Sequence, residues 1–168
     1  MISIPLIDKL PRCQKIYEHP LYKENFLKLQ ELEQDRIFCR HTFEHFLDVA
    51  RIAYIINLEH NLNIKREIIY AAALLHDIGR AMQYENGTPH EKAGAQISQI
   101  ILPECGFSDE ETQMIVNAIM SHRRGENEDE SLSGIIYTAD KTSRQCYICK
   151  AQKECNWSME KRNPEIYI

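Results

Sequence analysis

Apolar residues recur three or four positions apart along most of the chain, which is the spacing of one face of an α-helix. Between residues 42 and 60, for example, Phe46, Val49, Ala53 and Ile56 follow this spacing. No convincing alternation of apolar and polar residues, the pattern of a half-buried strand, is seen. The pattern predicts helices over 21–36, 42–60, 64–78, 89–102, 108–122 and 131–145, with a polar loop at 123–130.

Short motifs indicate where some of these helices begin and end. Thr88-Pro89-His90-Glu91 and Ser108-Asp109-Glu110-Glu111 both have the form of a capping box, and the first places proline at the first helical position. Asn63 can cap the helix that follows it, and Gly79 suits the C-terminal end of the same helix. The sequence therefore predicts an all-α fold, a compact helical bundle.

The size of the chain favours one domain with a hydrophobic core, because 168 residues lie within the usual range of single domains. A hydrophobic share of 43% and a charged share of 27% are those of an ordinary globular protein. We expect a single domain over 1–168, with its core at about 38–145 and a cysteine-containing extension at 146–168.

Charge and hydropathy exclude several classes of partner. The formal net charge of −5 argues against general nucleic-acid binding, which usually requires a basic excess. The longest apolar run, Ile68–Leu75, is too short to span a membrane. The N-terminus lacks the charged and apolar regions of a signal peptide. We therefore expect a cytoplasmic protein without a membrane partner, in which cysteines are thiols or metal ligands rather than disulfides.

An ionisable pair, His76 and Asp77, ends the apolar run Ala71–Leu75. Burying such a pair is costly unless something of opposite charge compensates it. A metal ion would do so, because imidazole and carboxylate both bind first-row metals well. Metal sites in helical bundles take ligands from facing helices. Further candidates are spread over the other predicted helices: His41, His45, His90, His122 and Asp140.

With these residues, the chain resembles the HD-domain superfamily of metal-dependent phosphohydrolases. The matching segments are His45–Ala50 and Ala73–Gly79, followed by His90, His122 and Asp140, and they cover about residues 38–145. The resemblance implies an all-α bundle of the HD-domain type. It also implies a phosphohydrolase that cleaves a phosphate ester or anhydride of a nucleotide or another small phosphorylated metabolite.

The resemblance further implies two groups of metal ligands that share Asp77. His90 and His122 would bind a second ion together with Asp77, as in the members of the family that hold two metals. The first ion would take four ligands: His45, His76, Asp77 and Asp140. Either one or two divalent ions are expected, and Fe, Mn, Zn, Mg, Ni and Co are not distinguished by the sequence.

The catalytic residues implied are His41, Asp77, Arg80 and Lys141. His41 lies four residues before His45, and related cyclic-nucleotide phosphodiesterases have a general acid at that offset. Its alternative role is that of a hydrogen-bond partner behind the ligands. Arg80 and Lys141 rank first among the nearby basic residues for holding phosphate oxygens. Two bridged cations can activate water and neutralise charge on a phosphoryl group.

Three other interpretations stay open. Residues 41–45 fit the H-x-x-E-H pattern of inverted zinc peptidases, but that interpretation leaves the remaining candidate ligands unexplained. HD-domain oxygenases with a mixed-valent di-iron centre have the same set of four histidines and two aspartates. A non-catalytic ligand-sensing HD domain is the third, although an intact ligand set argues against it.

Cysteines give a separate motif after the last predicted helix. Cys146, Cys149 and Cys155 are spaced C-x2-C-x5-C. Cys39 is a candidate fourth ligand, because Cys39 and Cys146 each lie six residues from a predicted ligand of the first ion. Four thiolates would suit zinc or an iron–sulfur cluster. Ordinary reduced thiols in a packed tail are the alternative.

Overall fold

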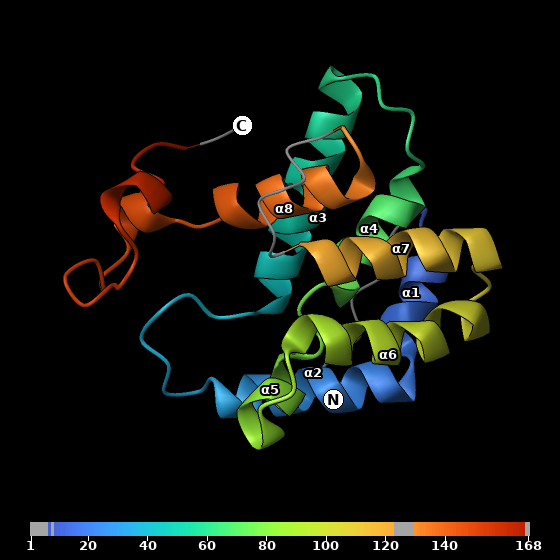
Figure 1. The fold of residues 1–168 in the computed structure, drawn as a ribbon, viewed down its shortest axis with the longest axis horizontal. Helices are drawn as coiled ribbons and strands as arrows, with labels where there is room; N and C mark the ends of the chain where they lie inside the picture. Colours follow the sequence, from blue (N-terminus) through green and yellow to red (C-terminus); the bar gives the residue numbers. More distant parts are fainter. Residues whose placement is uncertain (1–6, 8, 123–129, 167–168) are drawn as a thin grey trace.

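The computed structural model describes residues 7, 9–122 and 130–166. This part of the chain consists of helices joined by turns and loops and contains no strand, which confirms the predicted all-α fold (Figure 1). Its elements are α1 (Pro11–Glu18), α2 (Pro20–Leu32), α3 (Phe43–Glu59), α4 (Arg66–Leu75), α5 (Arg80–Asn86), α6 (His90–Glu104), α7 (Asp109–Ser121), α8 (Leu132–Thr142) and the 3₁₀ turns Cys146–Ile148 and Met159–Lys161.

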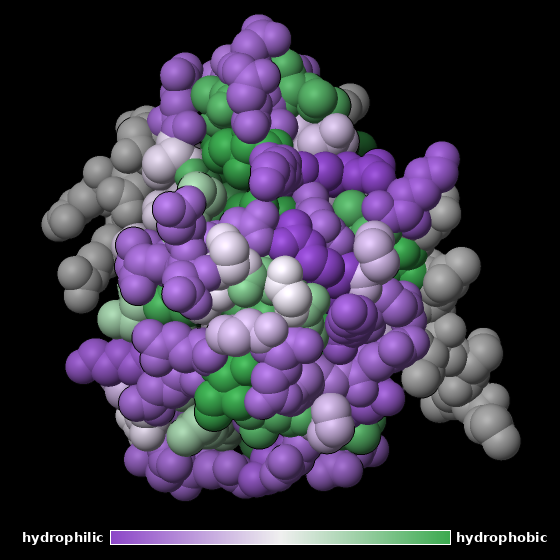
Figure 2. Space-filling model, turned by 90° about the vertical axis from the view of Figure 1, so that its right-hand side faces the viewer, coloured by the Kyte–Doolittle hydropathy of each residue, from purple (hydrophilic) through white to green (hydrophobic). Residues whose placement is uncertain are grey.

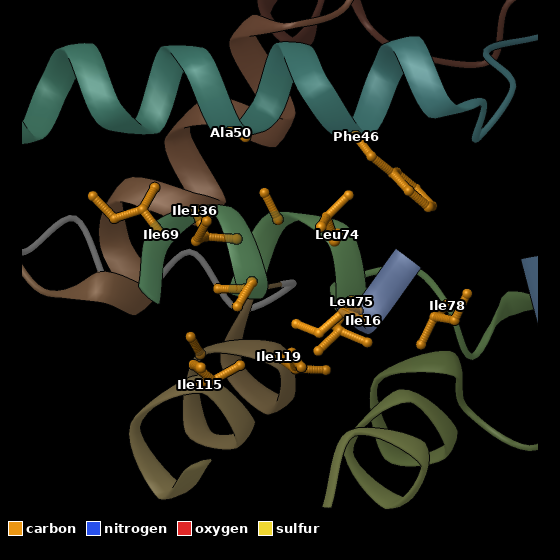
Figure 3. Close-up of a cluster of buried hydrophobic side chains, with 14 of the residues drawn as sticks. Ile16, Phe46, Ala50, Ile69, Leu74, Leu75, Ile78, Ile115, Ile119 and Ile136 are labelled. Carbon is orange, nitrogen blue, oxygen red and sulfur yellow. The ribbon is translucent and has the colours of Figure 1, made fainter. Parts of the chain in front are cut away.

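Helix α4 is the centre of the bundle. It contacts α1, α3, α7 and α8, and Ile69, Leu74 and Leu75 on it are fully buried. Figure 3 shows α4 between Phe46 and Ala50 on one side and the isoleucines of α7 on the other. The burial of its apolar residues, Ile68, Ile69 and Ala71–Leu75, keeps this helix in place. The face of the molecule drawn in Figure 2 is mostly hydrophilic, with apolar residues in small areas between polar ones.

Each of the six predicted helices is present, and two short ones were not predicted. Helices α1 and α5 have 8 and 7 residues, which is too short for a clear helical period. The prediction also placed several ends wrongly: the helix of 21–36 ends at Leu32, that of 64–78 at Leu75 and that of 131–145 at Thr142. The predicted loop of 123–130 lies, up to residue 129, outside the described residues.

One predicted capping box is confirmed. The Ser108 hydroxyl accepts from the Glu111 amide at 3.2 Å, and the Glu111 carboxylate accepts from the Ser108 amide at 3.1 Å. The box predicted at Thr88 is wrong, because Pro89 is the N-cap residue of α6 and makes no side-chain cap. Thr88 instead donates from its hydroxyl to the Asn86 side chain at 2.7 Å.

The predicted cap at Asn63 is also wrong. Asn63 has a φ of +59°, and its side-chain amide donates to the Asn61 carbonyl at 2.9 Å. Lys65 precedes α4 without a side-chain cap. Asn63 is therefore used in the left-handed turn before α4, a conformation that asparagine tolerates better than most residues.

Gly79 does not end α4 as predicted, but lies in the turn between α4 and α5. A Cβ atom at this position would lie 2.2 Å from the His90 carbonyl oxygen and 2.3 Å from the Gly94 amide nitrogen. Glycine is therefore needed for the close approach of this turn to the start of α6. The contact sets the distance between the His76-Asp77 turn and His90.

No helix in the described part of the chain has the length and the apolar character needed to cross a membrane.

Replacing Gly79 by alanine should destabilise the protein by about 3 kcal/mol, because the new methyl group meets backbone that cannot rotate away. Gly87→Ala is the matched control: Gly87 has a φ of +76° and open space around it, so only about 1–2 kcal/mol of backbone strain is expected. Urea unfolding of both variants measures the difference. Equal losses at the two positions would contradict the close-approach argument.

Arg12 joins α1 to two other helices. Its Nε lies 2.7 Å from Glu67 Oε2 on α4, and its Nη1 atom pairs with Glu111 on α7. The hydrogen bond from Arg12 is the main cause that lowers the pKa of Glu111 from 4.5 to about 2. A carboxylate with a lowered pKa stabilises the folded state above its unfolded pKa and loses that contribution as the pH falls.

Arg12→Met should accordingly cost about 1–2 kcal/mol of stability near pH 6. The difference from the native protein should shrink as the pH falls from 4.5 toward 2, because Glu111 becomes protonated first in the unfolded chain and only near pH 2 in the folded protein. Urea unfolding at several pH values measures this. A difference that stays constant below pH 4 would show that Arg12 acts through packing alone.

Candidate metal centre

The predicted ligands come together where several helices begin or end. His41 and His45 flank the start of α3, and His76 and Asp77 form the turn after α4. His90 is the first residue of α6, His122 caps the end of α7, and Asp140 lies in the last turn of α8. All of these residues are buried, with exposed fractions of 9% or less. Residues far apart in the sequence therefore share one interior site.

The first ligand group contains the residues implied for the first ion. One ligand atom from each lies within 4.8 Å of the others: His45, His76, Asp77 and Asp140. His76 Nε2 lies 3.2 Å from Asp77 Oδ2, and His45 Nε2 lies 3.4 Å from Asp140 Oδ1.

The second ligand group lies on the other side of the Asp77 carboxylate. Asp77 Oδ1 lies 3.1 Å from His90 Nε2 and 3.5 Å from His122 Nε2. These three residues also have ligand atoms within 4.8 Å of one another. The two oxygens of Asp77 thus face different groups, which is the arrangement that a bridging carboxylate needs.

Hydrogen bonds behind the histidines orient their rings. His76 Nδ1 donates to the Ala73 carbonyl at 2.7 Å, and His122 Nδ1 donates to the Ile119 carbonyl at 2.6 Å. A carbonyl oxygen only accepts, so the proton of each neutral ring is on Nδ1 and the lone pair is on Nε2. The ring atoms that face the centre are therefore the ones that can bind a metal.

The donor atoms of this centre fit a bound cation. His45 Nε2, His76 Nε2 and both oxygens of Asp77 are buried and make no hydrogen bond in the described structure. His90 Nε2 and His122 Nε2 lie only 3.2 Å apart. Lone pairs and carboxylate oxygens gathered in this way repel one another unless a positive charge lies among them.

The electrostatics of the centre favour charged carboxylates. Burial alone would raise the pKa of Asp77, but Arg80 and His76 lower it well below the ordinary value. Burial lowers the pKa of His76, but the Asp77 and Asp140 carboxylates outweigh burial and raise it to about 9. Without a cation, His76 is thus the group that takes up a proton, and metal binding would release that proton.

His45 behaves differently from His76. Burial lowers its pKa to about 4, against the opposing effect of Asp140. Its Nδ1 lies 3.4 Å from the Ser143 hydroxyl, which donates at 2.9 Å to the Asp140 carbonyl. His45 is therefore neutral near pH 7, as a ligand must be.

His41 belongs to neither ligand group. Its Nε2 lies 3.4 Å from Asp77 Oδ2, and its Nδ1 lies 2.6 Å from Glu33 Oε1. The His41 amide donates to Glu33 Oε2 at 2.7 Å, and the Tyr84 hydroxyl donates to Glu33 Oε1 at 2.7 Å. The peptidase interpretation needs His41 and Glu44 at the metal, but Glu44 is exposed. The structure gives that interpretation no support.

Sequence reasoning missed Glu33. It lies in a run of charged residues that the helical pattern placed inside the helix of 21–36, but α2 ends one residue earlier and Glu33 turns inward, 2% exposed. Burial raises the pKa of Glu33, and hydrogen bonds from His41 outweigh burial and lower it to about 2. No local sequence signal distinguishes this glutamate from its exposed neighbours.

Basic side chains surround the two aspartates. Arg80 Nε lies 2.8 Å from Asp77 Oδ1, and Lys141 Nζ lies 2.9 Å from Asp140 Oδ2, so both predicted cations are at the centre. Arg144 was ranked below Arg80 and Lys141 as a candidate for holding phosphate oxygens. It is buried and lies 2.7 Å from Asp140 Oδ1.

A cavity of about 320 Å³, which we call the adjoining cavity, is lined by His41, His122 and Asp140 of the centre. The predicted thiol ligands also line it: Cys39, Cys146, Cys149 and Cys155. Among the described residues, however, no cysteine belongs to a group of three or more ligand atoms within 4.8 Å. The thiols lie around one cavity but not at the spacing of one tetrahedral ion. A shared metal or cluster there stays a prediction.

Two ions per chain are expected, because each oxygen of Asp77 faces its own set of histidines. Protein purified without chelator should contain more than one transition-metal ion per chain by elemental analysis. His90→Ala should remove the second ion and leave the first, whereas His60→Ala, at an exposed histidine with no role in either group, should change nothing. A His90→Ala protein with the native metal content would contradict the two-ion arrangement.

Comparison with known proteins gives matches over most of the chain. The HD domain family matches residues 42–145. An uncharacterized protein of Clostridium beijerinckii is 49% identical over 138 residues, which cover 82% of this chain and 87% of that protein. Ribonuclease Y of Geobacter sulfurreducens is 28% identical over 125 residues, but these are 74% of this chain and only 22% of ribonuclease Y.

Among solved structures, a predicted HD superfamily hydrolase from an uncultured Thermotogales bacterium superposes with a TM-score of 0.59 at 26% identity. The superposition covers 83% of this chain and 80% of the other. Because the family match spans more than half of the 168 residues and includes the turn that carries His76 and Asp77, the chain belongs to the HD domain family.

Proposed function

We propose that this protein is a metal-dependent phosphohydrolase that cleaves a phosphate ester or anhydride of a small phosphorylated molecule, with nucleotides as the expected class. The observation that carries the proposal is the position of Asp77 between two ligand groups. Divalent ions, when bound, stabilise charge on phosphoryl oxygens and lower the pKa of water. The remaining roles belong to the side chains around them.

His41 is proposed to take part in proton transfer rather than in metal binding. It lies outside both ligand groups, yet its Nε2 is only 3.4 Å from Asp77 Oδ2. Glu33 accepts from both the ring and the backbone of His41, so the ring is held with Nε2 toward the centre. A histidine oriented by a buried carboxylate is a common arrangement for general acid–base work.

Arg80 and Lys141 are proposed to hold phosphate oxygens. Both line the adjoining cavity, and their side chains are 22% and 38% exposed, so a ligand in the cavity can reach them. Each is held near the centre by a carboxylate of a ligand residue. Charge-assisted hydrogen bonds from such cations to phosphate are stronger than neutral ones.

The names of related proteins favour hydrolysis over the oxygenase and ligand-sensing interpretations. One relative is a ribonuclease and one solved structure is described as a hydrolase. The match covers only 22% of ribonuclease Y, and the net charge of −5 here does not favour a long polyanion. A small phosphorylated substrate fits these facts better than RNA.

Asp77→Asn should lower metal content and hydrolysis together, with activity reduced about 100-fold or more, because the proposed bridge serves both ions. The substrates to test are a chromogenic phosphodiester, a chromogenic phosphomonoester and a panel of nucleotides. Asp48→Asn is the matched control, because Asp48 is on α3 but is 38% exposed and pairs with Arg51. It should keep native activity.

Two results would overturn the proposal. Native activity in Asp77→Asn would remove the assigned role of that residue. Iron-dependent oxygen consumption with an organic substrate, together with no phosphate release from any panel member, would establish the oxygenase interpretation instead.

A further inference from the structure

The adjoining cavity has a strongly basic lining. Its cationic residues are Arg36, Arg80, Lys141, Arg144 and Arg162, and Asp140 is the one carboxylate among its described lining residues. A chain with a net charge of −5 has therefore gathered positive charge at this cavity. The volume of about 320 Å³ is at the lower end of the range of small-molecule sites. The lining thus selects a small anion.

Two aromatic rings complete the lining. Phe38 lies in the loop between α2 and α3, and Trp157 lies in the segment after α8. Both are half-buried, and neither packs against another aromatic ring within the described structure. The loop and the tail extend on the same side of the bundle in Figure 1. Two unstacked rings on one basic cavity are typical of a site for a flat aromatic group.

The tail is fixed relative to the metal centre. The Asn163 side-chain amide donates to the Lys141 carbonyl at 2.7 Å and to the Arg144 carbonyl at 2.9 Å, and Asn163 is only 8% exposed. Arg162 Nε donates to the Trp157 carbonyl at 2.9 Å. These bonds hold the backbone of Trp157 against the end of α8, next to the ligand Asp140.

We propose that Phe38 and Trp157 form the part of the substrate site that binds a planar aromatic ring, while the cations of the cavity bind the phosphate. This inference rests on the proposed function, and it names the substrate class as a small phosphate with an attached aromatic ring, the size of a nucleoside monophosphate. Trp157 lies beyond residues 42–145 and Phe38 before them, so both rings lie outside the segment that matches the family. They are specificity-determining residues of this chain.

The native protein offers a direct measurement, because Trp157 is its only tryptophan. Adenosine 5′-monophosphate should quench the tryptophan fluorescence as its base stacks on the indole. Ribose 5-phosphate has the same phosphate and sugar but lacks the aromatic base, so it should quench little. The adenosine compound should bind about tenfold or more tightly by calorimetry, as base–aromatic stacking would give. The titrations are carried out at low temperature to slow hydrolysis. Phosphate release is measured in parallel, so that binding is separated from turnover.

Variants locate the effect. Trp157→Leu should bring the affinity for adenosine 5′-monophosphate close to that for ribose 5-phosphate, and Phe38→Leu should do so in part. Trp157→Phe keeps a ring and should keep most of the preference, which guards against a variant that merely disturbs the tail. Tyr147→Leu is the matched control, because this aromatic residue is in the same tail but does not line the adjoining cavity.

The outcomes separate this inference from the proposed function. Equal affinity for the two compounds, without quenching, overturns the aromatic site even if both are hydrolysed. A strong ring preference without hydrolysis of any phosphate leaves the aromatic site in place and overturns the proposed function. An equal loss in Trp157→Leu and Tyr147→Leu would show that the tail acts only through its fold, and would also overturn the assignment.

Discussion

The burial of one carboxylate, that of Asp77, is the constraint around which this structure is organised. Asp77 has no exposed surface and is charged, and an isolated buried charge of this kind would cost more than the protein's whole stability. The compensation comes from three elements: Arg80 begins α5, His90 begins α6, and His122 caps the end of α7. Their convergence on Asp77 is what brings the helix ends to one point.

The packed hydrophobic core fixes the positions of these charged groups. The second half of helix α4, Ala71–Leu75, is fully buried, so the turn that follows it cannot shift without disturbing the core. Because Gly79 has no side chain, the backbone of α6 can pack directly against it. The same close packing that stabilises the bundle therefore determines the separation of the ligand groups. A rigid core supporting polar ligands is what a preorganised site requires.

The loop before α3 and the tail after α8 complete the surroundings of the candidate metal centre. The loop between α2 and α3 supplies Glu33, which orients His41, and it also supplies Phe38. The tail after α8 supplies Trp157 and Arg162 to the same cavity. Loops and extensions on a fixed scaffold are where specificity usually varies, because their side chains are not constrained by the core. The adjoining cavity is thus lined both by residues of the centre and by residues of this loop and tail.

Local sequence was sufficient to predict the long helices and the residues that gather in the candidate metal centre. Hydrophobic periodicity is a local property, and it predicted α3, α4, α6, α7 and α8. The charged pair at the end of an apolar run was likewise visible in the local sequence and indicated a candidate site. The box at Ser108 could be predicted for the same reason, because its donors and acceptors lie within one turn. Each of these features depends on residues that are close in the chain.

Only the tertiary structure decided the remaining features. From the sequence, Gly79 was expected to end a helix. In the structure it must be glycine because the backbone of His90, 11 residues later, lies too close for any side chain. The sequence around Glu33 is that of an exposed glutamate. Only the structure shows that Glu33 is buried and hydrogen-bonded to His41 and Tyr84. The cysteines share a cavity without the spacing of one ion, which their C-x2-C-x5-C pattern could not reveal. These outcomes depend on contacts between distant segments, and local propensity carries no information about such contacts.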